Sequence, residues 1–136
     1  MRIAAAPIAL LLLAGTAPAP SVQGMWLTDD RKAVVRIAPC GANLCGTIDR
    51  VLDRSPASPT TDLHNPDPRL RGRPIVGLQI LTGFVRSGKL WKGGRAYDPK
   101  SGHSYRSTLA LNPDGSLKVT GCVLFVCESQ RWTRAR

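Results

Sequence analysis

The side chains best suited to chemistry are few and lie far apart in this chain. There are two histidines, His64 and His103, and four cysteines, and the sequence contains no G-x-S-x-G, H-E-x-x-H or glycine-rich phosphate-binding motif. A nucleophile–base pair would have to use one of the histidines, because cysteines held in disulfides are not nucleophiles. We therefore predict no catalytic residue, and a hydrolase that uses His64 with a carboxylate remains an alternative.

A long connection from Asp53 to Pro74 holds the densest group of polar residues. Connections of this length in compact domains are usually functional or disordered. A cation could be bound by Asp62, His64 and Asp67, but their spacing matches neither an EF-hand nor a structural zinc site. We favour turns in which acidic side chains cap backbone amides while the arginines bind carboxylates or carbonyls, and we predict no metal and no cofactor. If the loop acts in binding, it is as a lid, and its candidate residues are Asp62, His64, Asn65, Asp67, Arg69 and Arg71.

The four cysteines form two pairs with the spacing C-x4-C. Structural zinc sites usually space their ligands C-x2-C, so disulfides are the favoured interpretation in an exported protein. Three connectivities are possible for four cysteines. We prefer Cys40–Cys45, which flanks a predicted hairpin turn, together with Cys122–Cys127.

The N-terminus has the pattern of a secretory signal peptide. Arg2 precedes an apolar run from Ala4 to Ala14, and a small-residue Ala-x-Ala pattern follows, ending at Ala19. The run is shorter than the roughly 20 apolar residues that span a bilayer. We expect a cleaved signal peptide over residues 1–19, a single domain over residues 20–136 and a periplasmic or secreted location. No later segment is apolar enough to be a transmembrane segment of the mature chain.

The rest of the chain reads as short strands separated by turns. Eight runs rich in β-branched and aromatic residues recur between clusters of Gly, Pro, Asn and Asp. They span residues 24–28, 33–38, 45–52, 75–82, 89–97, 103–111, 116–123 and 128–134. Side chains alternate, since Leu117 and Val119 share one face while Lys118 and Thr120 share the other. Short connections predict an all-β, eight-stranded antiparallel up-and-down barrel with one long loop.

Several blocks in one order resemble a family of uncharacterised bacterial exported proteins that contain domain of unknown function 2147. The blocks run from Gly24-Met25-Trp26 through Cys40-Gly41-Ala42-Asn43-Leu44-Cys45-Gly46, the 62–74 loop and Tyr97-Asp98-Pro99 to Ser129-Gln130-Arg131-Trp132-Thr133-Arg134. The resemblance implies a lipocalin-like barrel. It also implies that Trp26 packs beneath Arg134 or Arg131 in a cation–π contact that closes the base. The family provides no established catalytic or ligand residues.

An eight-stranded barrel is just wide enough to be filled by side chains or to hold one small ligand. The leading hypothesis is a barrel that binds a small hydrophobic or amphipathic molecule. Its predicted walls are Val35, Ile37, Ile48, Leu78, Ile80, Trp91, Tyr105 and Leu109. The alternative is a solid barrel that binds anionic envelope surfaces, because removal of Arg2 lowers the formal net charge of +10 only to +9. We predict no nucleic-acid partner, because alternation separates the basic residues from the aromatic rings.

Overall fold

The computed structural model describes residues 2–13, 15 and 21–136. Part of the segment interpreted as a signal peptide, including the predicted cleavage region near residue 19, lies outside the described residues. In the described part of the chain, no helix has the length and apolar character needed to cross a membrane.

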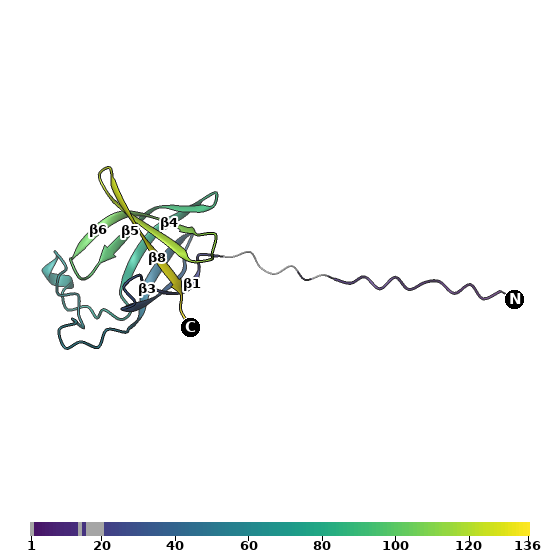
Figure 1. Cartoon of the computed structure of the whole chain (residues 1–136), viewed down its shortest axis with the longest axis horizontal. Helices are drawn as coiled ribbons and strands as arrows, with labels where there is room; N and C mark the ends of the chain where they lie inside the picture. The colour runs from purple at the N-terminus through teal and green to yellow at the C-terminus, as the bar shows by residue number, and fades with distance from the viewer. Residues whose placement is uncertain (1, 14, 16–20) are drawn as a thin grey trace.

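Eight antiparallel strands follow one another around a closed barrel (Figure 1). The strands are β1 (Gly24–Leu27), β2 (Ala33–Cys40), β3 (Asn43–Val51), β4 (Gln79–Ser87), β5 (Leu90–Asp98), β6 (His103–Leu111), β7 (Leu117–Val123) and β8 (Val126–Arg134). The long connection between β3 and β4 contains the short 3-10 helix η1 (Pro68–Leu70). The predicted all-β, eight-stranded up-and-down barrel with one long loop is therefore confirmed.

The two ends of the barrel differ in their connections. Because successive strands run in opposite directions, the tight turns at 41–42, 88–89 and 112–116 lie at the end where β1 begins and β8 finishes. The connections 28–32, 52–78, 99–102 and 124–125 lie at the other end. We call these the closed end and the open end. In Figure 1 the chain enters the barrel and leaves it on the side away from the long β3–β4 connection.

The fourth strand lies later in the chain than the predicted 75–82. It begins at Gln79 because residues 75–78 form a turn, in which the Leu78 amide donates to the Ile75 carbonyl at 3.1 Å. Gly77 has a φ of 88°, in the left-handed region that favours glycine. Ile75 and Leu78 are nevertheless buried, so their apolar character indicated a core position without indicating a strand.

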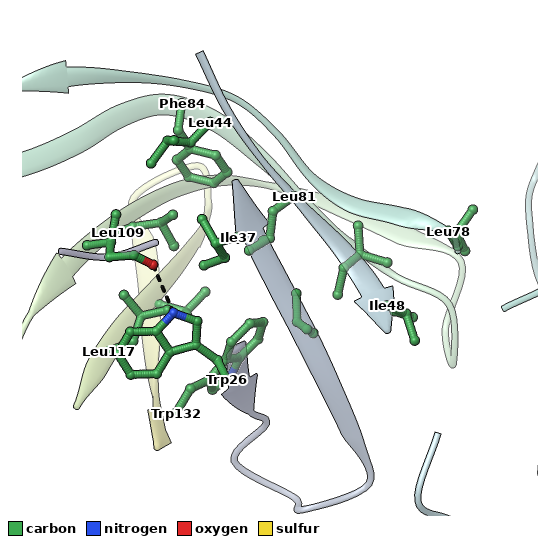
Figure 2. Close-up of a cluster of buried hydrophobic side chains, with 14 of the residues drawn as sticks. Trp26, Ile37, Leu44, Ile48, Leu78, Leu81, Phe84, Leu109, Leu117 and Trp132 are labelled. Carbon is green, nitrogen blue, oxygen red and sulfur yellow. Dashed lines mark hydrogen bonds between the residues drawn. The ribbon is translucent and has the colours of Figure 1, made fainter. Parts of the chain in front are cut away.

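Large side chains fill the closed half of the barrel. Trp26, Phe84, Leu109 and Leu117 are fully buried, and Figure 2 shows the cluster they form with their neighbours. The indole of Trp26 donates to the Val22 carbonyl at 2.8 Å, so its polar atom is satisfied inside the core. This half of the barrel is a packed hydrophobic core.

Glycines on neighbouring strands make room for two of the core side chains. A Cβ on Gly94 would collide with the ring of Phe84, and a Cβ on Gly46 would lie 2.8 Å from Leu81 Cδ1. Each large side chain therefore lies flat across the backbone of the next strand. Phe84 and Leu81 both point into the barrel, and the register between strands determines which glycine each of them packs against.

Gly94→Ala should destabilise the barrel by about 1–3 kcal/mol, because the added methyl group forces Phe84 out of its position. The measurement is the urea midpoint of unfolding followed by tryptophan fluorescence. Gly72→Ala is the matched control, because a Cβ at Gly72 meets no atom within 4 Å. Equal midpoints for the two variants would contradict the packing described.

Candidate functional site: a cavity at the open end

A cavity of about 740 Å³ occupies the open half of the barrel. Its deepest lining residues are nearly inaccessible to solvent and are apolar: Ile48, Leu81, Val119 and Trp132. Two small residues, Ala96 and Gly121, also line the cavity wall. Ala96 and Gly121 leave space at these positions that larger side chains would fill.

Strand β8 contributes an alternating row of side chains to the cavity wall. Glu128, Gln130 and Trp132 lie at every second position and all line the cavity. The indole N–H of Trp132 donates to Gln130 Oε1 at 2.9 Å, so both polar groups are satisfied. The carboxylate of Glu128 makes no hydrogen bond or ion pair with any residue that the structure describes. In the sequence, polar residues at every second position of this strand were the pattern from which a polar inner wall could have been predicted.

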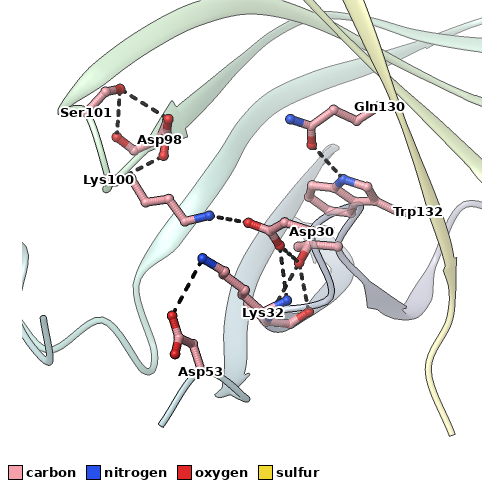
Figure 3. A network of polar contacts seen from close by, with 10 residues as sticks. Asp30, Lys32, Asp53, Asp98, Lys100, Ser101, Gln130 and Trp132 are labelled. Carbon is pink, nitrogen blue, oxygen red and sulfur yellow. Dashed lines mark hydrogen bonds and ion pairs between the residues drawn. The ribbon is translucent and has the colours of Figure 1, made fainter. Parts of the chain in front are cut away.

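Charged side chains from three connections form the rim of the cavity (Figure 3). Lys100 of the β5–β6 turn pairs with Asp30 of the β1–β2 loop, and Lys32 pairs with Asp53 at 3.7 Å. Burial by itself raises the pKa of Asp30, but hydrogen bonds from Lys100 and Thr28 outweigh it, and the pKa lies below its ordinary value. These contacts join three connections around the mouth. None of them was predicted from the sequence, because they join residues that are far apart in the chain.

The predicted wall residues separate into two groups. Ile48, Ile80 and Tyr105 line the cavity. The other five lie outside its lining: Val35, Ile37, Leu78 and Leu109 are buried in the core, and Trp91 packs against that core while partly exposed.

The long β3–β4 connection is organised around the fully buried carboxylate of Asp62. Its two oxygens accept hydrogen bonds from Tyr97 Oη at 2.5 Å, Asn65 Nδ2 at 2.8 Å and Arg73 Nη2 at 3.0 Å. Burial by itself raises the pKa of Asp62, but these three donors lower it further than burial raises it. Because Tyr97 also lines the cavity, the Asp62 network fixes part of the cavity wall.

The remaining loop candidates make local contacts. Asn65 Oδ1 accepts from the Asp67 amide at 2.8 Å, Asp67 pairs with Arg69 at 3.0 Å, and Arg71 Nε donates to the Asn65 carbonyl at 2.8 Å. The residues Asp62, His64, Asn65, Asp67, Arg69 and Arg71 all lie outside the cavity lining, and the loop borders the mouth through residues 53, 58, 59 and 75 instead.

Both histidines are exposed, and no described residue forms a salt bridge with either of them. His64 lies in the turn that packs against Gly102, where a Cβ would collide with the His64 carbonyl. Within the described residues, no group of three or more His, Cys, Asp or Glu is arranged to hold a metal ion.

The cysteines form two disulfides, Cys40–Cys45 at the closed end and Cys122–Cys127 at the open end. At the closed end the guanidinium of Arg134 lies over Trp26, with Cζ 3.9 Å from the ring centroid. Arg131 instead points to Asp114, which accepts from Arg131 Nη2 at 2.6 Å. Of the two arginines considered for the contact with Trp26, Arg134 therefore occupies that position.

Comparisons with known proteins agree with this architecture. The model of a family described as "Uncharacterized protein conserved in bacteria (DUF2147)" matches residues 24–134. Among solved structures, the chain is similar to protein HP1028 from the human pathogen Helicobacter pylori, which is described as belonging to the lipocalin family. The sequence identity is 23%, the TM-score is 0.74, and the match covers 85% of this chain and 84% of that one. At this identity the likeness shows the fold alone, a lipocalin-like barrel. A search of curated proteins gave no match.

The hydroxyl of Tyr97 should ionise near pH 12, because burial and the hydrogen bond to Asp62 raise its pKa to about 12 from the ordinary 10.0. The stability that comes from this raised pKa is present below pH 10 and is lost as the pH rises through about 12. Tyrosinate absorbance should be titrated in Tyr105→Phe, which leaves Tyr97 as the single tyrosine. Adding Asp62→Asn should lower the midpoint, and an unchanged midpoint would exclude the contact.

Proposed function

The chain belongs to the bacterial family whose model spans residues 24–134, and from its lipocalin-like barrel we propose that it binds a small hydrophobic or amphipathic molecule in the open-end cavity. The observation that carries the proposal is the cavity itself. Its volume of about 740 Å³ falls within the range of roughly 300–1,000 Å³ found for small-molecule sites. An apolar floor beneath a charged rim suits a molecule with one apolar and one polar end.

We propose that the protein acts outside the cytoplasm, in the periplasm or after secretion. Two disulfides support this location, because thiols are kept reduced in the bacterial cytosol. The apolar N-terminal segment supports it as well, through the signal-peptide pattern of residues 1–19. On this proposal the mature protein is the single domain over residues 20–136.

The charges around the cavity narrow the class of ligand. The chain as a whole has a formal net charge of +10, yet the cavity is lined by more carboxylates than amines. The charged lining residues are Asp29, Asp30, Asp53, Asp98, Glu128, Lys32 and Lys100. Both lysines are already paired with aspartates, whereas Glu128 has no such partner among the described residues. We therefore propose that the polar end of the ligand is neutral or cationic.

Filling the cavity should abolish binding of an apolar probe. Ala96→Phe places a ring in the cavity, so the affinity for the neutral fluorophore N-phenyl-1-naphthylamine should fall at least about tenfold. The affinity is measured by fluorescence enhancement. Ala110→Phe is the matched control: Leu109 points into the core, so Ala110 faces the outside of the same barrel. Unchanged binding by Ala96→Phe would refute the cavity as the site.

The cavity should bind a cationic amphiphile more tightly than an anionic one of the same chain length. At pH 7 dodecylammonium should displace the probe at a concentration about five- to tenfold lower than dodecanoate does, since one charge near the rim is worth about 1 kcal/mol. Glu128→Gln should reduce this difference. Asp49→Asn, which removes a carboxylate outside the cavity lining, should leave it unchanged. Tighter binding of dodecanoate by the native protein would show that the proposed charge preference is wrong.

A further inference from the structure

The tip of the β7–β8 hairpin exposes four consecutive apolar residues at the open end. Val123, Leu124, Phe125 and Val126 have exposed fractions of 54%, 77%, 101% and 71%. In Figure 1 this yellow hairpin projects clear of the barrel. Isolated exposed apolar residues are ordinary, but four in succession at a projecting tip indicate a contact surface.

The backbone of this tip is held in a conformation that its residues do not favour. Leu124 has a φ of 52°, in the left-handed region where glycine and asparagine are preferred. Glycine, which is preferred at the first central position of a two-residue hairpin turn with positive φ there, would be both less apolar and less strained. The Cys122–Cys127 disulfide joins the strands next to the turn, and Arg106 Nη2 donates to the Leu124 carbonyl at 2.6 Å. A strained apolar turn is thus held in place by a covalent bond and a charged donor.

Basic residues stand on the outer wall directly behind the tip. Arg106 lies opposite Arg95 in the β5–β6 pairing and opposite Cys122 in the β6–β7 pairing, so the two guanidinium groups share the outer face with the disulfide. Neither arginine forms an ion pair with another described residue. The acidic Glu128 of the same hairpin lines the cavity instead. The hairpin therefore presents apolar side chains at its end and negative charge toward the cavity, while the neighbouring strands β5 and β6 place positive charge on the outer wall beside it.

This combination fits a lipid surface better than a protein groove. A stable protein interface buries roughly 800 Å² on each partner and involves about 20 or more residues, far more than a four-residue tip can supply. Binding at a bilayer surface needs only a few apolar side chains in the headgroup region and basic residues that attract anionic lipid. Because the tip is narrow and convex, its apolar side chains can enter the headgroup region while the barrel stays in water.

We propose that the β7–β8 hairpin tip inserts into the surface of a bilayer that contains anionic lipid. Val123 and Val126 belong both to the tip and to the cavity lining. Insertion would therefore bring the mouth of the cavity against the membrane surface. The docking itself does not require the cavity to bind a ligand.

The test is flotation with vesicles of 70% phosphatidylcholine and 30% phosphatidylglycerol. The protein is recovered from the periplasm of a host that expresses the full chain, and its mass defines the processed N-terminus. The test variant is Leu124→Gly/Phe125→Asn, which keeps the disulfide and places glycine at the position with positive φ, so that it should fold at least as well. Its affinity for the vesicles should be at least about tenfold lower than that of the native protein.

Two further variants locate the contact. Leu63→Asn/Val76→Asn removes two exposed apolar side chains from the long loop and should bind vesicles like the native protein. Phe125→Trp should show a blue-shifted tryptophan emission on vesicles and quenching by brominated lipid. N-phenyl-1-naphthylamine binding without vesicles should be unchanged in the tip variant, so that failure of docking and failure of the proposed function are separate results.

Three outcomes would overturn the proposal. The first is the absence of native protein from the floated fraction. The second is equal flotation of the tip variant, which would assign binding to the general positive charge. The third is concentration-dependent self-association of the native protein that the tip variant loses, because that result would assign the tip to a second copy of the chain.

Discussion

The closure of the barrel between its first and last strands is the interaction on which the rest of the structure depends. Strand β1 has only four residues, and its register with β8 consists of Trp26 opposite Arg134 and Leu27 opposite Thr133. Arg134 strengthens this short seam by covering the Trp26 ring and donating from Nη1 to the Gln23 carbonyl at 2.6 Å. Gly24 makes room for it, since a Cβ there would lie 2.6 Å from Arg134 Nη1. Without this seam, β1 and β8 would be free edges with unpaired backbone groups, and the cavity would have no continuous wall.

The barrel is filled by side chains in its closed half and contains a cavity in its open half. The buried rings of Trp26 and Phe84 fill the closed half, and the core there satisfies the close packing that folded domains require. The open half holds a cavity of about 740 Å³ where Ala96 and Gly121 replace larger side chains. Apolar surface left unfilled in this way lowers stability. The Asp62 network then orders the long loop beside the cavity by satisfying one buried carboxylate with three donors.

At the open end, negative and positive charges lie on opposite sides of the barrel wall. Carboxylates line the cavity at its rim and at Glu128, while the outer face near the β7–β8 tip carries Arg95 and Arg106. A protein with this arrangement can attract anionic lipid with its outside and accept a neutral or cationic amphiphile inside. Docking and binding would then use the same hairpin, because its disulfide holds the tip and the cavity wall in a fixed relation.

The sequence alone was sufficient for the barrel, because side-chain alternation and short turns depend on residues close together in the chain. His103 to Leu111, for example, was predicted with the bounds that the structure shows. The 75–82 strand was misplaced because burial of Ile75 and Leu78 arises from a turn packed on the core, which has the same apolar signature as a strand. The tertiary structure alone decided which inward residues meet a cavity, since Leu109 and Tyr105 share a face of β6 yet lie at different depths. It also decided the rim pairs and the choice of Arg134 over Arg131, because such contacts depend on the register and closure of distant strands, which no local pattern encodes.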